Sequence, residues 1–353
     1  MVPMEASHGM PRTQPGRSGG EDRIVRLIQK RFARSAPFLK RGIGDDAAVF
    51  RPRGADELWA VTTDLLLEDI DFRPGWMTPA QLGHKALAVN LSDLAAMGVR
   101  PRCYTVALGL PGQPERGWID KFYRGLCGLG EVHGAVLIGG DLSNSSHGLH
   151  ISVTAFGETL DNKLLYRSGG SPGDSLFVTG VLGRAAAGLR LLSLGKLRGT
   201  SAPERLALKA QRAPEPRCAT GLWLARSGLA SCMMDLSDGL SCDLPRLCAA
   251  CGTGAEIYSR QLPVFRDSAS WGCDPAGLAL HGGEDVELLF GVPEKKLKAF
   301  RKSYPAGHPP ATLIGILTRS PRLVCRSGPG TPPVALPPLG FDHFRSPTHA
   351  LGT

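Results

Sequence analysis

The side chains best suited to chemistry in this sequence are acidic, and they recur beside glycine in short clusters along most of the chain. The clusters comprise Asp45-Asp46, Asp64, Asp93, Asp141, Asp235, Asp238 and Glu284-Asp285. Several stand among apolar residues, where a carboxylate costs several kcal/mol to bury unless a cation or a hydrogen-bond donor accompanies it. Mg²⁺ prefers oxygen ligands and usually shares them between carboxylates and phosphates. The pattern therefore predicts one metal-rich site for a polyphosphate.

The length and charge of the chain limit the class of protein. At 353 residues it is long enough for two domains, each with its own core, and its 42% hydrophobic content suits a globular enzyme. The formal net charge is +9, but Lys and Arg are scattered and form neither a run nor a basic helix. We therefore expect no nucleic-acid partner, and a basic surface instead favours small polyanions.

The cysteines and the apolar runs bear on localisation. Nine cysteines at irregular spacing predict free thiols in a reducing compartment. The N-terminus lacks the apolar core of a secretory signal, and no apolar run reaches the roughly 18 residues of a membrane span. We expect a cytoplasmic protein without a membrane partner. Cys248 and Cys251, with Cys242 nearby, leave zinc binding open, but no further pair completes four ligands, so packing cysteines are favoured.

The first half of the chain predicts a disordered leader followed by a domain. Residues 1–20 are rich in Gly, Pro, Ser and Arg without apolar periodicity, which indicates the leader, and the domain is expected over 21–160. Its expected elements are a helix over 22–32, a strand over 58–63 that delivers Asp64 to its end, a helix between Thr78-Pro79 and Gly98, a strand over 136–138 that runs into Gly139-Gly140-Asp141, and a strand over 149–157. Lys85, inside the apolar helix, is expected to pair with a carboxylate.

The second half predicts another domain. A turn-rich stretch over 167–174 is typical of a domain junction, and the second domain is expected over 168–345. Its expected elements are a strand over 175–179, a helix over 184–194, a Pro-containing linker near 202–217, a helix opened by Asp235-Leu236-Ser237-Asp238-Gly239, and a strand over 286–292. Because glycine-aspartate clusters occur in both halves, we expect the site in a cleft between two domains.

Six motifs carry a resemblance to a known family. They are Gly42-Ile43-Gly44-Asp45-Asp46, Thr62-Thr63-Asp64, the run from Lys85 to Gly98, Gly139-Gly140-Asp141, the run from Asp235 to Gly239, and Gly282-Gly283-Glu284-Asp285. In this order they resemble the motifs of the thiamine-monophosphate kinases, which belong to the superfamily of aminoimidazole ribonucleotide synthetase. The resemblance spans roughly 21–344, and an ordered set is far more specific than any one motif.

The resemblance implies an α+β, two-domain architecture like that of aminoimidazole ribonucleotide synthetase. In it, the N-terminal sheet pairs across a homodimer and a C-terminal α+β domain packs beside it. The implied reaction converts ATP and thiamine monophosphate into ADP and thiamine diphosphate by direct transfer assisted by several Mg²⁺ ions. Two alternatives stay open: another ATP-using member of the superfamily, such as an aminoimidazole ribonucleotide synthetase, and a non-catalytic regulator that binds nucleotide or thiamine.

The resemblance also assigns roles to residues. Metal ligation is implied for Asp46, Thr62, Thr63, Asp64, Asp93, Asp141, Asp235 and Asp238. Contact with ATP is implied for Gly140, Asp141, Arg167 and Ser237, and contact with the thiamine substrate for Asp71, Glu284 and Phe341. A structural ion pair is the alternative role for Arg167, and a core position is the alternative for Phe341.

Asp71 departs from the family pattern. Family members usually carry a His before Phe at this point, next to the substrate, whereas this chain reads Asp71-Phe72. An ionised carboxylate cannot donate a hydrogen bond to a phosphate, and it repels one unless a cation intervenes. The departure bears on the identity of the acceptor rather than on kinase chemistry, so a related phosphorylated acceptor stays an alternative.

Overall fold

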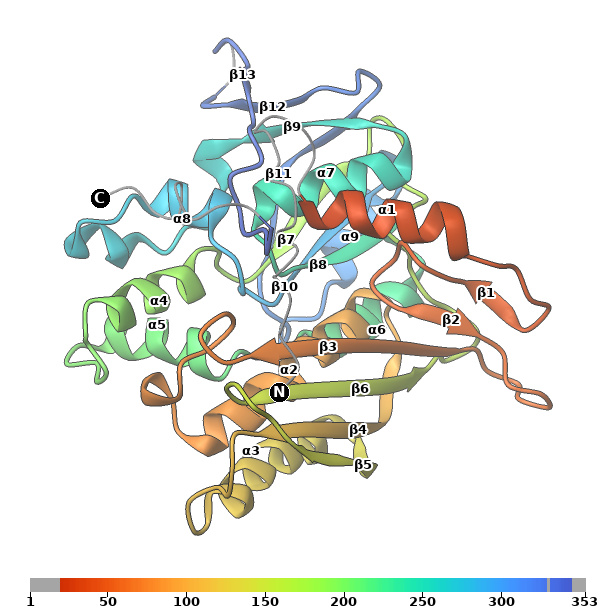
Figure 1. Ribbon diagram of the computed structural model, residues 1–353. Coiled ribbons are helices and arrows are strands. Elements are labelled where there is room, and N and C mark those ends of the chain that lie inside the picture. The colour runs from red at the N-terminus through yellow and green to blue at the C-terminus, as the bar shows by residue number, and fades with distance from the viewer. Residues whose placement is uncertain (1–19, 329–330, 345–353) are drawn as a thin grey trace, which may run out of the picture.

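The computed structural model describes residues 20–328 and 331–344, which form two mixed sheets with helices packed against them (Figure 1). The first sheet has the strand order β1-β2-β3-β6-β4-β5, and only β4 and β5 pair in parallel. Its strands are β1 (Leu39–Arg41), β2 (Ala48–Phe50), β3 (Trp59–Leu67), β4 (Arg100–Leu110), β5 (Val136–Asn144) and β6 (His150–Glu158). The predicted leader lies outside the described residues except for Gly20, which begins the first helix.

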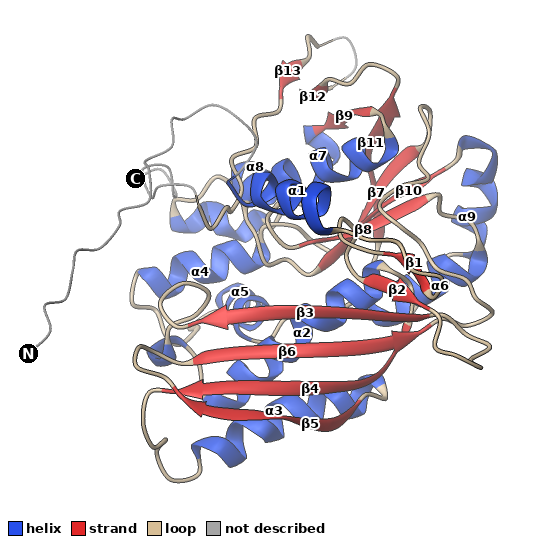
Figure 2. Ribbon diagram, turned by 45° about the vertical axis from the view of Figure 1, so that its right-hand side comes forward, coloured by secondary structure: helices blue, strands red, loops and turns tan. Residues whose placement is uncertain are grey.

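Helices α2 (Pro79–Ala96) and α3 (Trp118–His133) cover one face of this sheet (Figure 2). Along β3, Ala60 and Thr62 are buried, whereas Thr63 and Leu65 are exposed on the opposite face. Strand β5, at the edge of the sheet, is exposed along almost its whole length. The first sheet therefore has one packed face and one open face.

The second sheet has the strand order β13-β12-β9-β11-β7-β10-β8. Its strands are β7 (Ser175–Thr179), β8 (Cys232–Leu236), β9 (Gly254–Tyr258), β10 (Glu287–Val292), β11 (Ala311–Thr318), β12 (Leu323–Arg326) and β13 (Val334–Ala335). Helix α7 (Leu240–Cys251) packs on β8 and β9. The remaining helices are α1 (Gly20–Phe32), α4 (Arg184–Ser193), α5 (Ala202–Arg212), α6 (Cys218–Ser227), α8 (Pro275–His281) and α9 (Leu297–Ser303), with short 3-10 helices at Pro74–Trp76, Ser259–Gln261, Arg266–Trp271 and Glu294–Lys296. In the described part of the chain no helix has both the length and the apolar character that crossing a membrane requires.

Helix α2 joins the two halves and begins as its sequence predicts. The hydroxyl of Thr78 accepts from the backbone N–H of Gln81, the Gln81 side chain accepts from the N–H of Thr78, and Pro79 occupies the first turn. Gly98 follows its end at a φ of +68°, which glycine adopts without steric cost. The helix packs on β3 and β6 of the first sheet and on β8 and α6 of the second half. Its position therefore fixes both halves relative to each other.

Most expected elements are confirmed, and the exceptions have local causes. Asp64 lies inside β3 rather than at its end, and Gly139-Gly140-Asp141 lies inside β5, which continues to Asn144. The expected linker near 202–217 is wrong, because residues 202–212 form α5, with a capping box between Ser201 and Glu204 and a proline in the first turn. The motif that begins at Asp235 does not open a helix directly: Asp235 and Leu236 end β8, and α7 starts at Leu240.

The contact between α2 and α3 gives a test of the fold. A Cβ on Gly125 of α3 would lie 1.8 Å from the carbonyl oxygen of Ala80, whereas a Cβ on Gly128 of the same helix would meet nothing within 4 Å. We expect Gly125→Ala to lower the free energy of unfolding by about 2 to 4 kcal/mol, because the two helices must separate. Gly128→Ala should raise it by about 0.5 to 1 kcal/mol, because alanine loses less backbone entropy in a helix. Urea denaturation measures both changes, and equal effects would contradict this packing.

Candidate active site

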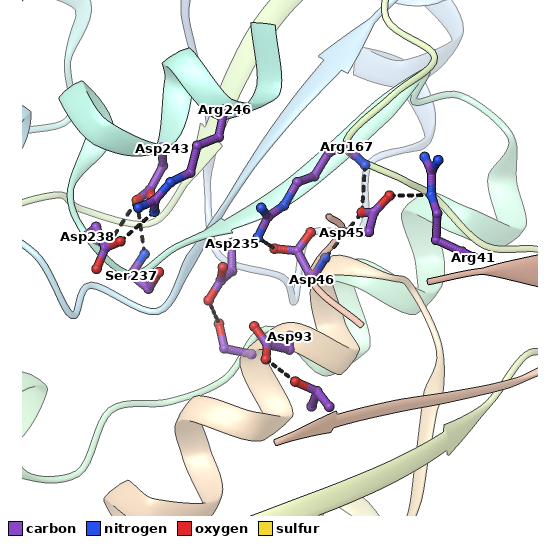
Figure 3. A network of polar contacts seen from close by, with 12 residues as sticks. Arg41, Asp45, Asp46, Asp93, Arg167, Asp235, Ser237, Asp238, Asp243 and Arg246 are labelled. Carbon is purple, nitrogen blue, oxygen red and sulfur yellow. Dashed lines mark hydrogen bonds and ion pairs between the residues drawn. The ribbon is translucent and has the colours of Figure 1, made fainter. Parts of the chain in front are cut away.

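Three carboxylates from three elements meet between the two halves of the molecule (Figure 3). Asp46 precedes β2, Asp93 lies in the last turn of α2, and Asp235 lies on β8. One oxygen of each lies within 4.8 Å of an oxygen of each of the other two. No other set of three His, Cys, Asp or Glu side chains within residues 20–328 and 331–344 is arranged in this way. We call these three residues the acid triad.

Each member of the acid triad accepts a hydrogen bond from a side chain, yet some buried carboxylate oxygens in this region have no hydrogen-bond partner. The donors are the hydroxyl of Thr62 to Asp93, Ser92 Oγ to Asp235 Oδ2 at 2.7 Å, and the guanidinium of Arg167 to Asp46 Oδ1 at 2.7 Å. The buried Oδ2 of Asp46 has no hydrogen-bond partner, and neither has the buried Oδ2 of Asp64. Such an atom loses its hydration without compensation, so each of the two is an expected position for a cation.

The pKa values in this region indicate the same shortage of positive charge. Burial, followed by the charge of Asp46, raises the pKa of Asp235 to about 7. Burial and the neighbouring carboxylates raise the pKa of Asp64 to about 6. The pKa of Asp93 is raised as well, first by burial and then by the charges of Asp64 and Asp235. Asp64 therefore belongs electrostatically to the acid triad.

The donor set fits a hard divalent cation. The acid triad and Asp64 offer carboxylate oxygens, with the hydroxyl of Thr62 beside them, and Mg²⁺ selects such oxygens over nitrogen or sulfur. Arg167 supplies one positive charge: although burial opposes its charged form, Asp46 keeps the pKa of Arg167 above its ordinary value. One guanidinium does not neutralise four carboxylates, so the remaining negative charge favours metal ions.

Asp238 lies in a second polar group, around Arg246 of α7 (Figure 3). Arg246 donates to Asp238, to Asp243 Oδ1 at 3.0 Å and to Asp22 Oδ1 of α1 at 3.1 Å. Asp243 Oδ2 accepts from the backbone N–H groups of Ser237 and Asp238, each at 3.1 Å, and so holds the turn between β8 and α7. The predicted metal ligand Asp238 is therefore already paired with an arginine.

Glu284 belongs to a third polar group, in which it pairs with Lys85 of α2. Lys85 is fully buried, and its Nζ lies 2.5 Å from Glu284 Oε1, so the predicted pairing of Lys85 is confirmed. Gln211 of α5 donates to the other oxygen of Glu284. Glu284 has a φ of +65°, a conformation that is strained for a residue with a side chain. The two partners hold the carboxylate in place against this strain.

Asp71 lies near Glu284, and Phe341 lies next to Asp238, because its backbone N–H donates to the carbonyl oxygen of Asp238 at 3.0 Å. Asp71 Oδ2 accepts from the backbone N–H of Leu67 at 2.8 Å. Burial raises the pKa of Asp71. The hydrogen bond from Leu67 and the charge of His343 lower this pKa, whereas the charge of Glu284 raises it. The Phe341 side chain meets His343 edge to face with ring centroids 4.7 Å apart, but Phe341 is 44% exposed. The alternative of a core position for Phe341 is therefore wrong.

Other predicted site residues are not among the hydrogen-bond partners of the acid triad. Gly140 and Asp141 lie on the exposed edge strand β5. Thr63 points to the opposite face of β3 from Thr62, because successive residues of a strand alternate, and it donates to the carbonyl oxygen of Val153 at 3.1 Å. Ser237 is exposed in the turn after β8.

The sequence reasoning missed several residues that hold the acids. Asp45 Oδ2 forms an ion pair with Arg41 Nε at 2.8 Å, and Asp45 Oδ1 accepts from the backbone N–H of Arg167 at 3.0 Å. Arg167 thus binds Asp45 through its backbone and Asp46 through its side chain, so the ion-pair role considered for it is confirmed. Asp243 and Arg246 follow Asp238 within about two helical turns, so their spacing was an available signal. Nothing in the sequence marks Arg41.

Comparison with known proteins identifies the family. Residues 44–159 match the family model described as AIR synthase related protein, N-terminal domain, and residues 171–327 match that of the C-terminal domain. The chain is 37% identical over 332 residues to the thiamine-monophosphate kinase of Escherichia coli (strain K12), which covers 93% of this chain and 99% of that protein. It is 33% identical over 306 residues to the thiamine-monophosphate kinase of Bacillus subtilis (strain 168), covering 86% and 93%.

A solved structure described as AaThiL complexed with AMPPCP and TMP matches with a TM-score of 0.79 at 30% identity, covering 92% of this chain and 97% of that chain. The sequence and structural matches thus extend over both halves of the molecule and over nearly the whole length of these relatives. The chain belongs to the AIR synthase related proteins and, among them, to the thiamine-monophosphate kinases.

Proposed function

We propose that this protein is a kinase that uses ATP to phosphorylate thiamine monophosphate to thiamine diphosphate. The observation that carries the proposal is the acid triad, with its unpartnered buried oxygens, at the junction of the two halves. Relatives that match this chain over nearly their whole length are named thiamine-monophosphate kinases. A solved relative is described as complexed with AMPPCP and TMP.

We assign several Mg²⁺ ions to the acids. The proposed ligands at the acid triad are Asp46, Asp64, Asp93 and Asp235 with Thr62. Asp238, Asp141 and Thr63 are proposed as ligands of further ions from the family motifs alone, because none of them lies among the partners of the triad. Bound Mg²⁺ supplies neutralisation of phosphate charge and alignment of the reacting groups, which are the main requirements of phosphoryl transfer. The support is the chemistry of the donor set and the excess of buried negative charge.

The chain's own groups bind and orient the two substrates. Arg167, which Asp46 and Asp45 hold, is the proposed contact to ATP phosphates, together with Gly140, Asp141 and Ser237. Because the acceptor is a phosphate monoester that is ionised at neutral pH, no strong general base is needed. We assign binding of the thiamine part of the substrate to Glu284, Asp71 and the exposed ring of Phe341.

We further propose a cytoplasmic homodimer whose subunits meet through the first sheet. Strand β5 leaves an edge exposed along almost its whole length, and Val136 and Ile138 on it are 62% and 61% exposed. Leu65 adds exposed apolar surface on the open face. Apolar surface on an unpaired edge strand favours association. All nine cysteines are free, which supports a reducing compartment.

Both alternatives considered from the sequence receive less support. An aminoimidazole ribonucleotide synthetase is disfavoured because the matched relatives of high coverage are named as kinases. A non-catalytic regulator gains nothing from several uncompensated buried carboxylates, since these lower the stability of the fold unless metal is bound.

Asp93→Asn tests the reaction and the metal site together. With ATP and Mg²⁺ the unaltered protein should form thiamine diphosphate, and the variant should lose about 10²- to 10³-fold in kcat, because one ligand charge is removed. Asp120→Asn, which changes an exposed acid on α3, should keep full activity. Chromatography of thiamine diphosphate provides the measurement. If the unaltered protein binds ATP but forms no thiamine diphosphate, thiamine monophosphate is not its acceptor. Full activity of Asp93→Asn would contradict the assignment of Asp93 as a metal ligand.

Asp235→Asn tests whether the buried carboxylates lack compensating positive charge, through its effect on the stability of the fold. The folded pKa of Asp235, about 7, exceeds the ordinary value of 3.8, so the favourable contribution of the protonated acid is present below about pH 4 and is lost as pH rises through 7. Without metal, the variant should therefore be nearly equal in stability to the unaltered protein at pH 4, and its advantage should grow as pH rises to about 7 and reach about 2 to 4 kcal/mol at pH 8. Mg²⁺ should stabilise the unaltered protein more than the variant. Thermal unfolding at both pH values checks this, and a destabilised variant at pH 8 would refute it.

Asp71→Asn tests whether Asp71 lies beside the acceptor phosphate. Asparagine keeps an acceptor for the N–H of Leu67 and removes the charge, so the KM for thiamine monophosphate should fall about threefold with little change in kcat. Asp69→Asn removes the same charge from an exposed neighbouring position and should leave KM unchanged. Steady-state kinetics compares the two. If both variants change KM equally, the cause is a long-range effect of charge, and Asp71 does not contact the substrate.

A further inference from the structure

Two cysteines of the second half lie next to the loop that carries Arg167, and phosphoryl transfer uses neither of them. Cys232 begins β8, the strand of Asp235, and Cys251 ends α7. Their thiols are hydrogen-bonding partners. Cys232 is fully buried, whereas Cys251 is partly exposed. The pair thus joins a partly exposed cysteine to a fully buried one.

The loop over 167–170 lies directly on both sulfur atoms. Cys251 Sγ donates to the carbonyl oxygen of Arg167 at 3.1 Å. A Cβ on Gly170 would lie 2.8 Å from Cys232 Sγ and 2.9 Å from Cys251 Sγ, so both sulfurs approach the same point of the backbone. A rearrangement of the two sulfurs must therefore be accompanied by a movement of this loop.

The same loop is tied to the acid site on its other side. The backbone N–H of Arg167 donates to Asp45 at 3.0 Å, and its guanidinium donates to Asp46 at 2.7 Å. Arg167 is therefore held between the cysteine pair, through its carbonyl group, and the acids, through its N–H and side chain. Phosphoryl transfer is sensitive to misplacements of about 1 Å in groups that orient the substrate.

We propose that Cys232 and Cys251 form a reversible disulfide that lowers the kinase activity under oxidising conditions. A peroxide oxidises the exposed Cys251 thiol to a sulfenic acid and is itself reduced to water or an alcohol. The Cys232 sulfur then attacks the Cys251 sulfur, an S–S bond forms, and the sulfenic oxygen leaves as water with the thiol proton. A dithiol reductant reverses the reaction. The bond removes the S–H donor from the Arg167 carbonyl group and brings the sulfurs to about 2.05 Å, which displaces the loop.

The surroundings favour Cys251 as the thiol that reacts first. The hydrogen bond from Cys232 lowers the pKa of Cys251, burial opposes this, and the backbone N–H groups of Gly170 and Gly169 add to the lowering. The thiolate is the form that peroxides attack. Cys248 lies on the same helix but is buried, and burial raises its pKa to about 12. Cys248 is therefore a matched control.

The test exposes the reduced full-length protein to hydrogen peroxide, blocks the remaining thiols and identifies cross-linked peptides by tandem mass spectrometry. Trypsin leaves Cys232 with Cys242 on one peptide and Cys248 with Cys251 on the next, so fragment ions must locate the bond. We expect a link between Cys232 and Cys251, a fall of about tenfold in thiamine diphosphate formation, and recovery with dithiothreitol. Cys232→Ser and Cys251→Ser should resist inactivation, while Cys248→Ala should be inactivated like the unaltered protein.

Two outcomes would overturn the inference. One is the absence of a Cys232–Cys251 link after peroxide treatment, and the other is a link that leaves the activity of the protein unchanged. The peptide result does not depend on the proposed reaction. A reduced protein that forms no thiamine diphosphate before any oxidant is added would count against the proposed function, whereas the peptide result would still decide the disulfide.

Discussion

The repulsion among carboxylates that the fold buries side by side governs this molecule. Asp46, Asp93 and Asp235 come from a loop, a helix and a strand, and the only arginine that donates to them among the described residues is Arg167. Burial, and after it the repulsion from neighbouring carboxylates, favours proton uptake and raises the pKa values of Asp93 and Asp235. Packing of α2 and β8 in the core holds the acids together in spite of this. A divalent cation, as proposed above, would relieve this repulsion.

Helix α2 converts this packing into a fixed spacing between the two ends of the site. Asp93 near its C-terminal end belongs to the acid triad, and Lys85, about two turns earlier, binds Glu284. At 1.5 Å per residue, the eight positions between them correspond to about 12 Å along the helix axis. Because the helix is packed between both halves, neither group shifts without the other. The distance between the acid triad and Glu284 is therefore a property of one rigid element.

The sequence predicted the parts of the site that short motifs encode and missed those that the tertiary fold creates. The Thr78 cap, the left-handed Gly98 and the pairing of Lys85 follow from local rules and are confirmed. Helix α5 was misread because its proline suggested a linker, although a proline in a first turn behind a serine cap is a helix start. The contact of Arg246 with Asp22, in contrast, joins two helices that lie far apart in the sequence, which periodicity does not report.

The two acid groups differ in what a metal ion must displace. The acid triad has unpartnered buried oxygen, so a cation entering there breaks no ion pair. Asp238, in contrast, accepts from Arg246, which a cation at Asp238 would have to displace. Arg246 also holds Asp243 and Asp22, so it keeps two partners when Asp238 leaves, and the exchange costs less than breaking an isolated buried pair. We therefore expect the ion at the triad to bind to the free protein, and an ion at Asp238 to bind only when the phosphates of a nucleotide add ligands. The order of metal binding then follows from which carboxylates the chain has already paired.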